Sequence, residues 1–261
     1  MAGQMNVKHY KAYLLDLDGT IYRGKEPIPE AAAFVKQLKE KRIPYLFITN
    51  NSTSLPQEVA VKLQNMGVPC EEEQVLTTST AAASYITSSK NSPSAYVIGE
   101  EGLKEAVDQA GVIEEEDNPD YVIIGMDREI TYSKLAAACL AVRNGACFIS
   151  TNADKALPSE RGFLPGNGAL TSVISVSTGV DPVFIGKPEK VMMQQAVDIL
   201  GAAPEEICLV GDNYDTDILA GIRAGMDTLH VDTGVTSREE AAGKSIPPTY
   251  AVASLSVWSI V

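Results

Sequence analysis

Near the N-terminus an apolar run leads directly into two carboxylates, in the stretch Ala12-Tyr13-Leu14-Leu15-Asp16-Leu17-Asp18-Gly19-Thr20. The run predicts a short buried strand that ends at Asp16. In open parallel sheets ligands bind outside the carboxyl ends of the strands, and carboxylates buried there cost free energy unless they are used. The spacing of Asp16 and Asp18, with Gly19 for a tight turn, lets both carboxylates face one point. One of them can then attack a substrate, as in enzymes that form an aspartyl-phosphate, while the other transfers a proton. The structural alternative is a turn capped by an aspartate.

The same order of a short apolar run, a polar turn and a helical pattern that stops at glycine recurs along the chain. Further strands are expected at Ile43–Ile48, Ala95–Ile98, Tyr121–Ile124, Cys147–Ser150, Val183–Ile185, Ile207–Val210 and Thr228–Val231. Helices are expected at Pro29–Arg42, between Ser54 and Gly67, and at Glu101–Ala110, Tyr132–Arg143, Pro188–Leu200 and Asp217–Ala224. Such alternation indicates βαβ units, an α/β fold class and a mostly parallel sheet.

Two short segments rich in Ser, Thr, Gly or Pro are predicted to be linkers, because this composition is typical of hinges. Thr77–Thr80 precedes the middle group of elements, and Ser177–Pro182 follows it. At the C-terminal end, the apolar stretch Val252–Val261 contains the only tryptophan, Trp258. We expect this side chain to pack on the core.

The overall composition is that of a globular protein and argues against several kinds of partner. The 261 residues suffice for one large α/β domain or two domains, and 45% hydrophobic with 21% charged residues excludes a disordered or fibrous chain. A net charge of −13 repels phosphate backbones and anionic lipids. We therefore expect neither a nucleic acid nor a membrane surface as partner, and an anionic substrate would need a cation in its site.

Cysteine usage and the distribution of apolar residues predict a soluble cytoplasmic protein. The four cysteines form no CxxC pair, which argues against a zinc site and a disulfide framework and fits a reducing compartment. The first ten residues are polar and show no signal peptide. No apolar run approaches the length of a membrane span.

A third carboxylate, Asp212, follows the expected strand Ile207–Val210 and gives the first pair a partner for binding a metal ion. Mg²⁺ takes oxygen ligands, typically one or two carboxylates together with waters and substrate phosphate. In the same acidic stretch, Asp217 can cap the next helix or orient the metal's ligands, and Asp215 can do either. An EF-hand is excluded, because the required glycine and terminal glutamate are misplaced.

Two further segments offer groups that can bind phosphate. Thr49 ends the expected strand Ile43–Ile48, and Asn50 and Asn51 follow it. A hydroxyl with neighbouring main-chain N–H groups can hold phosphoryl oxygens, although this sequence is also common in ordinary loops. Lys187 lies just before a helix that opens with proline, where an ammonium can neutralise a phosphoryl oxygen or offset clustered aspartates.

Other catalytic motifs fit poorly. Gly243-Lys244-Ser245 resembles the end of a P-loop, but Arg238 occupies the position of the required earlier glycine. The chain has no Gly-x-Ser-x-Gly elbow and only two histidines, which argues against a Ser-His-Asp triad. A glycosidase carboxylate pair stays formally open, but it would need neither a lysine nor a third aspartate at a strand end.

Taken in order, these motifs resemble the haloacid dehalogenase superfamily of phosphohydrolases. The long gap between Thr49 and Lys187 resembles subclass IIA, in which a C2-type α/β cap is inserted between the second and third motifs. Four stretches are similar to the N-acetylglucosamine-phosphate and 4-nitrophenyl-phosphate phosphatase branch: Asp16–Tyr22, Thr49–Ser52, Thr151–Asp154 and Pro165–Ala169. The resemblance implies a Rossmann-like, mostly parallel sheet core at 1–78 and 183–261, with an inserted second α/β cap domain at 79–182.

The resemblance also implies a role for each residue of the four motifs. Asp16 attacks phosphorus and becomes the aspartyl-phosphate, and Asp18 protonates the leaving oxygen and later deprotonates the attacking water. Mg²⁺ is held by the Asp16 carboxylate, the Asp18 main-chain carbonyl and Asp212. Thr49 and Lys187 hold the phosphoryl oxygens. Asp217 supports either the metal's ligands or Lys187, and Asn50 and Asn51 contact the phosphate or the leaving group.

The function expected from these residues is Mg²⁺-dependent hydrolysis of small phosphomonoesters, sugar phosphates included. A homodimer is compatible with this expectation. A phosphotransferase or phosphomutase would use the same intermediate, and a non-catalytic phosphate- or metal-binding module would keep the site without turnover. Asp18 argues against the module, because metal binding alone needs no second side-chain carboxylate. In the cap, the residues expected near the leaving group are Asn152, Asp154 and those around Gly166. Three cap cations, Arg128, Lys155 and Arg161, could bind an anionic substrate. The alternative for each is an exposed charge on the protein surface.

Overall fold

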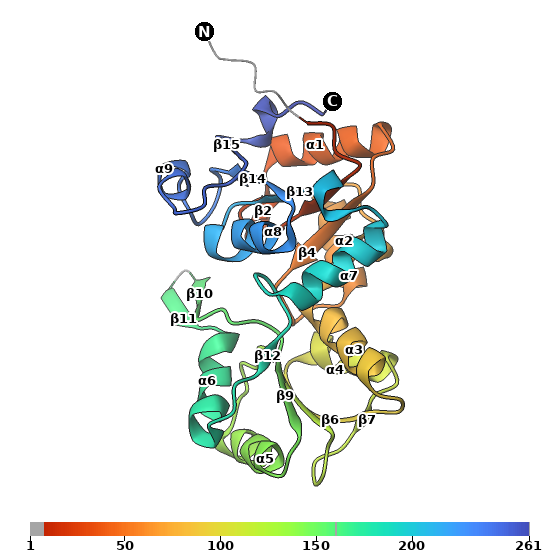
Figure 1. Ribbon diagram of the computed structural model, residues 1–261, viewed down its shortest axis with the longest axis vertical. Helices are drawn as coiled ribbons and strands as arrows, with labels where there is room; N and C mark the ends of the chain where they lie inside the picture. The colour runs from red at the N-terminus through yellow and green to blue at the C-terminus, as the bar shows by residue number, and fades with distance from the viewer. Residues whose placement is uncertain (1–7, 160, 261) are drawn as a thin grey trace. The chain divides into compact units, whose positions relative to one another are not determined.

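Residues 8–159 and 161–260 are described by the computed structural model, in which the chain divides into two units (Figure 1). The first unit contains the described residues up to Thr49, then Val59–Leu76, and the described residues from Met193 onward. The second unit contains Asn50–Glu58 and the described part of Thr77–Met192. The domain boundaries predicted from the sequence stay a prediction, and the chain passes between these two units at other residues.

A parallel sheet forms the centre of the first unit. Its six described strands lie in the order β15-β14-β13-β1-β4-β5. Their bounds are β1 (Ala12–Leu15), β4 (Tyr45–Thr49), β5 (Val75–Thr77), β13 (Ile207–Gly211), β14 (Asp227–Val231) and β15 (Tyr250–Val252). The pairs β1–β13, β1–β4, β13–β14 and β14–β15 are all parallel.

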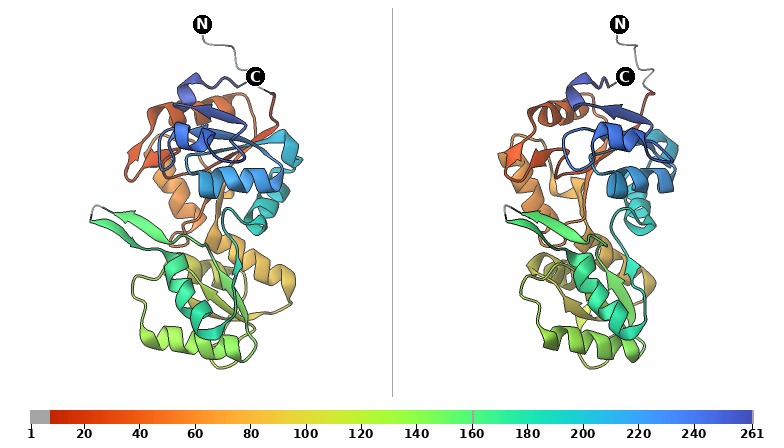
Figure 2. Two further views of the ribbon diagram at one scale, coloured as in Figure 1. Left: turned by 60° about the vertical axis from the view of Figure 1, so that its left-hand side comes forward. Right: turned by 90° about the vertical axis from the view of Figure 1, so that its left-hand side faces the viewer.

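Helices cover both faces of this sheet, with α1 and α2 on one side and α7 and α8 on the other (Figure 2). The helices are α1 (Pro29–Glu40), α2 (Pro56–Asn65), α7 (Lys190–Leu200), α8 (Leu219–Ala224) and α9 (Arg238–Ala242). Single turns lie at Glu72–Gln74, Pro204–Glu206, Tyr214–Ile218 and Leu255–Val257, and the short strands β2 (Tyr22–Arg23) and β3 (Glu26–Pro27) pair antiparallel.

The core of the first unit follows from the apolar strand β1, all four of whose residues are buried. Tyr13 packs edge-on against Phe34 of α1, with ring centroids 5.4 Å apart. Trp258 is 4% exposed and packs against Tyr250 at 4.9 Å, so the prediction that the C-terminal tryptophan joins the core is confirmed.

The second unit has its own five-stranded sheet, in the order β12-β9-β8-β6-β7, and every pair in it is parallel. The strands are β6 (Ser94–Ile98), β7 (Ile113–Glu114), β8 (Tyr121–Ile124), β9 (Cys147–Ser150) and β12 (Val183–Phe184). The helices are α3 (Thr78–Ser89), α4 (Glu101–Gln109), α5 (Tyr132–Arg143) and α6 (Asn167–Thr178). Helices α5 and α6 lie on one face and α3 and α4 on the other (Figure 1), and an antiparallel pair, β10 (Ala156–Ser159) and β11 (Gly162–Pro165), projects from the unit (Figure 2).

The predicted α/β fold with mostly parallel sheets is confirmed. The predicted linker Thr77–Thr80 lies where the chain passes from the first unit to the second, but its residues also begin α3: Thr77 Oγ1 accepts a hydrogen bond from the Thr80 N–H at 3.2 Å. Threonine and serine serve both loops and helix N-caps, so composition alone could not separate the two. The other predicted linker, Ser177–Pro182, begins inside α6, which ends at Thr178 with Gly179 as its left-handed cap. In the described ranges, no helix is both long and apolar enough to cross a membrane.

Candidate active site

The carboxyl ends of three neighbouring strands bring Asp16, Thr49 and Asp212 to one edge of the first unit's sheet. Strand β1 lies between β4 and β13, and Leu15 is in register with Phe47 on one side and Val210 on the other. The main-chain N–H of Asp16 continues the ladder to Val210 O at 3.0 Å. The chain leaves β1 toward β4 on one side and returns as β13 on the other. Such a point in a parallel sheet is where ligands bind.

Three buried carboxylates converge at this edge. One carboxylate oxygen from each of Asp16, Asp212 and Asp217 lies within 4.8 Å of the others, and the three residues are 8%, 1% and 1% exposed. Asp217 lies in the π-helical turn Tyr214–Ile218. Like charges held this close and away from water repel one another, and a cation bound among them would reduce this repulsion. Hard carboxylate oxygens are the ligands that Mg²⁺ prefers, and the residues present therefore fit this ion.

Asp212 is fixed from several directions by the first unit. Its Oδ1 accepts a hydrogen bond from the Thr20 hydroxyl at 3.2 Å, and its Oδ2 accepts one from the Val235 N–H at 2.6 Å. A Cβ added to Gly19 would lie 2.5 Å from the Asp212 Cγ, and Gly19 also has a φ of +91°. A Cβ at Gly234 would collide with the same carboxylate. Both glycines are therefore needed for the main chain to approach Asp212 closely.

The segment after β14 and a buried histidine complete this support, and sequence reasoning found neither. The Thr236 N–H donates to Asp212 O at 3.2 Å. His230 is fully buried, and its Nε2 lies 3.1 Å from Asp212 O and 3.0 Å from Thr236 O. Because both partners are carbonyl acceptors, Nε2 carries the proton. The stretch Asp232-Thr233-Gly234-Val235-Thr236, which follows the buried strand β14, was the sequence signal for this loop.

Asp18 differs from Asp16 in being exposed and outside the carboxylate cluster. The main chain around it is fixed by a bridge to Tyr22 and by the Gly19 N–H, which donates to Tyr22 O at 2.7 Å. A lysine that sequence reasoning missed lies nearby: the Lys62 Nζ is 3.6 Å from the centroid of the Tyr22 ring. Burial lowers the pKa of Lys62, and the negative charge of Asp18 acts in the opposite direction. The first unit therefore places a cation near the carboxylate expected to transfer protons.

The other predicted site residues, Asn50, Asn51 and Lys187, belong to the second unit. Lys187 is 2% exposed, and its main chain is hydrogen-bonded to the Asn50 side chain. Asn152 is buried and donates to Asn50 O at 2.8 Å, and Asp154 accepts from the Asn50 amide at 3.2 Å. Two of the expected cap residues therefore meet Asn50 within their own unit.

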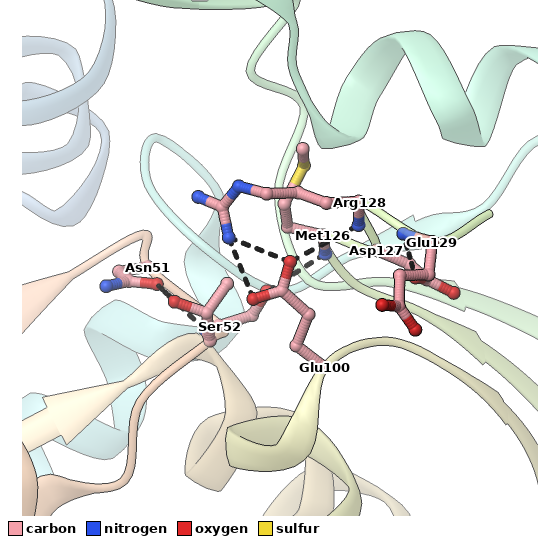
Figure 3. Close-up of polar contacts among 8 residues, drawn as sticks. Asn51, Ser52, Glu100, Met126, Asp127, Arg128 and Glu129 are labelled. Atoms are coloured by element: carbon pink, nitrogen blue, oxygen red, sulfur yellow. Dashed lines mark hydrogen bonds and ion pairs between the residues drawn. The ribbon is translucent and has the colours of Figure 1, made fainter. Parts of the chain in front are cut away.

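The segment that follows Thr49 in the sequence is anchored in the second unit (Figure 3). Asn51 Oδ1 accepts from the N–H and the hydroxyl of Thr53, both at 2.8 Å. Ser52 is 1% exposed, and its Oγ accepts from the Met126 N–H at 3.1 Å. A Cβ at Gly102 would lie 2.5 Å from the main chain of Thr53. Close packing and hydrogen bonding thus fix this segment.

The predicted cap cations have different surroundings. The Arg128 guanidinium pairs with Glu100, with Nη1 at 2.8 Å from each carboxylate oxygen (Figure 3). This pairing favours the alternative of an exposed structural charge for Arg128. Lys155 and Arg161 are exposed residues of the second unit.

Comparison with known proteins identifies the family. A family profile described as haloacid dehalogenase-like hydrolase matches residues 13–113, and one described as HAD-hydrolase-like matches residues 184–258. The chain is 56% identical to the 5′-nucleotidase YutF of Bacillus subtilis, over 97% of this chain and 98% of that protein. It is 52% identical to an acid sugar phosphatase of Staphylococcus epidermidis, over 96% and 97% of the two chains. The chain belongs to the haloacid dehalogenase-like hydrolases.

A solved structure is similar to this haloacid dehalogenase-like hydrolase in both sequence and fold. The p-nitrophenyl phosphatase from Archaeoglobus fulgidus is 34% identical, covers 95% of this chain and 98% of its own, and superposes with a TM-score of 0.92. The predicted enzyme class, a phosphoric monoester hydrolase of the haloacid dehalogenase type, is confirmed at the level of the family. The first profile spans Asp16, Asp18 and Thr49, and the second spans Lys187, Asp212 and Asp217.

Proposed function

We propose that this hydrolase is a Mg²⁺-dependent phosphatase that acts on small phosphomonoesters through an aspartyl-phosphate on Asp16. Sugar phosphates are among the proposed substrates, and 4-nitrophenyl phosphate serves as an artificial one. The observation that carries the proposal is the group of buried carboxylates of Asp16, Asp212 and Asp217 at the carboxyl edge of a parallel sheet. The phosphatase and nucleotidase names of its relatives support the substrate class.

The carboxylates of Asp16 and Asp212 and the main-chain carbonyl of Asp18 would hold Mg²⁺, and Asp217 would support these ligands or Lys187. When bound, the ion neutralises the charge on the phosphoryl oxygens and reduces their repulsion from the carboxylates. The Asp212 carboxylate keeps its orientation through Thr20 and Val235, independently of the ion.

The side chains of the enzyme carry the proton and phosphoryl transfers. Asp16 Oδ forms a bond to phosphorus as the bond to the leaving oxygen breaks, and Asp18 donates its proton to that oxygen. Water then attacks the phosphorus of the aspartyl-phosphate, Asp18 takes the proton of the water, and Asp16 is released together with phosphate. Thr49, Lys187 and the main chain near Asn51 hold the phosphoryl oxygens. Positioning and charge neutralisation dominate the catalysis of such reactions.

The test is release of inorganic phosphate from 4-nitrophenyl phosphate and from a panel of sugar phosphates, with Mg²⁺ and with excess EDTA. Wild-type turnover that EDTA abolishes and Mg²⁺ restores supports the proposal. Trapping the Asp16 phosphoryl group by rapid acid quench and mass spectrometry tests the intermediate. A folded wild-type protein without metal-dependent turnover on any substrate would contradict the proposal, and transfer of phosphate to a second substrate instead of water would indicate a phosphotransferase.

A further inference from the structure

The Asn50 side chain forms hydrogen bonds with both the N–H and the carbonyl of the Lys187 main chain. Its Oδ1 accepts a hydrogen bond from the Lys187 N–H at 2.9 Å, and its Nδ2 donates one to Lys187 O at 3.0 Å. The two residues are 137 positions apart in the sequence, and both belong to the second unit. A primary amide is suited to this contact because it carries a donor and an acceptor side by side.

Two other segments, one with Thr78 and one with Asn152 and Asp154, hold Asn50 in place. Its main-chain carbonyl accepts hydrogen bonds from the Asn152 amide at 2.8 Å and from the Thr78 hydroxyl at 3.0 Å. Its Nδ2 also donates to the Asp154 carboxylate, at 3.2 Å and 3.4 Å from the two oxygens. The Nδ2 group has two hydrogens, so Lys187 O and Asp154 together use its donor capacity. This leaves the Asn50 amide no hydrogen for a substrate oxygen.

The packing around Gly186 supports the same role. A Cβ on Gly186 would lie 2.6 Å from Asn50 Oδ1 and 2.7 Å from Thr151 O. Only a residue without a side chain therefore lets the strand that leads to Lys187 approach Asn50 this closely. Lys187 itself is 2% exposed, so the direction of its side chain depends on how its main chain is held.

We infer that Asn50 is a positioning residue that fixes the main chain of Lys187, and that Asp154 orients the Asn50 amide for this purpose. The inference rests on the proposed function, in which the Lys187 ammonium holds a phosphoryl oxygen. It replaces the sequence-based expectation that the Asn50 side chain contacts phosphate or leaving group. Misplacing a catalytic group by about 1 Å can cost on the order of 10²-fold in rate, so a loose Lys187 main chain has a measurable effect.

The test is a double-mutant cycle on kcat for 4-nitrophenyl phosphate, using Asn50→Ala, Lys187→Met and the two together. If Asn50 acts through Lys187, we expect Asn50→Ala to lower kcat by roughly 10–100-fold beside the wild-type lysine and by less than about 3-fold in the Lys187→Met background. Asn144→Ala, at an exposed position after α5, is the matched control and should leave kcat unchanged.

Each other result of the cycle would overturn the inference. Equal losses with and without Lys187 would mean that Asn50 acts on its own, for example on the substrate. No loss for Asn50→Ala would remove its role, and wild-type kcat in Lys187→Met would remove the role of Lys187 while leaving phosphatase activity intact. Inactivity of the wild-type enzyme on all substrates would instead be a failure of the proposed function.

A second variant separates positioning from folding. Asn50→Asp keeps the shape and the acceptor but loses the donor to Lys187 O and places a carboxylate beside Asp154. Adding Asp154→Asn removes this repulsion, so we expect the double variant to regain thermal stability while kcat stays roughly 10-fold or more below that of Asp154→Asn alone. Recovery of kcat in parallel with stability would contradict a positioning role.

Discussion

Two polar regions of this enzyme, one in each unit, are built in opposite ways. Around Asp212 in the first unit, like-charged carboxylates converge, and main-chain N–H groups and a hydroxyl hold them in place. Around Asn50 in the second unit, amides and hydroxyls meet main-chain groups with donors facing acceptors. Buried polar groups are stable when they have matched partners or a bound ligand. In the proposed function a bound Mg²⁺ is the ligand of the first region, whereas the second region matches its donors and acceptors within the chain.

The largest effect is expected from removing the proposed nucleophile, Asp16, in the first unit. Asp16→Asn should lower kcat by about 10⁴-fold or more, because an amide cannot form the acyl phosphate. The measurement is phosphate release from 4-nitrophenyl phosphate, with Asp215→Asn as the matched control, since Asp215 is exposed in the same acidic stretch. Comparable residual activity in the two variants would remove Asp16 from its role.

Asp18→Asn should lower kcat by ~10²–10⁴-fold, the usual contribution of general acid–base catalysis. Its side chain is exposed and lies outside the carboxylate cluster, so the melting temperature and its response to Mg²⁺ should stay at the wild-type values. Steady-state kinetics and thermal melts on one preparation check both points. An unchanged kcat, or a lost response to Mg²⁺, would count against this assignment.

The gain in melting temperature on adding Mg²⁺ should depend on the first region and not on the second. A ligand present at about 100 times its Kd stabilises the folded state by ~2.7 kcal/mol, so Mg²⁺ should raise the melting temperature of the wild type. Asp217→Asn removes one of the clustered charges, and it should raise the melting temperature in EDTA while reducing the gain on adding Mg²⁺. Asp154→Asn, in the second unit, should leave that gain unchanged. The comparison fails if both variants respond to Mg²⁺ alike.

In the second unit, Ser52→Ala should cost stability without any dependence on metal. The substitution leaves the Met126 N–H without its acceptor inside a buried contact, at a cost of ~1–3 kcal/mol in the free energy of unfolding. Urea unfolding with and without Mg²⁺ measures the loss, and Ser88→Ala, at an exposed position of α3, is the control. A loss that differs between the two conditions would show that the regions are energetically coupled.

The smallest effect concerns Lys62, whose pKa burial lowers from the ordinary value of 10.5. The folded state loses this proton at a lower pH than the unfolded state, so the penalty for charging Lys62 is fully present below the folded pKa. The free energy of unfolding of the wild type, relative to Lys62→Met, should therefore rise as the pH increases toward 10.5. Urea unfolding at several pH values checks the sign, and a falling difference would contradict it.

The sequence predicted the strand ends well because parallel βαβ units bring them to one edge by necessity. Tyr121–Ile124, Tyr132–Arg143 and Cys147–Ser150 have the predicted bounds, and Asp16 and Asp212 lie together. Asp217 was expected as a supporting residue, but the π-helical turn Tyr214–Ile218 brings its carboxylate to the other two, and local patterns do not reveal such turns. Helix α3 was missed because its Thr, Ser and Ala residues resemble a linker. The Asn50–Lys187 contact joins residues too distant in the chain for any periodicity to relate them.

The glycines at positions 19 and 234 give a simple criterion for examining other genomes. Their main chains press against the Asp212 carboxylate so closely that any side chain at either position would push it away. A homologous protein that keeps all the acidic residues but carries alanine or a larger residue at one of these positions would have to place the carboxylate that corresponds to Asp212 elsewhere. We expect such a protein to lack the Mg²⁺ site proposed for this chain, even though it keeps every acidic residue.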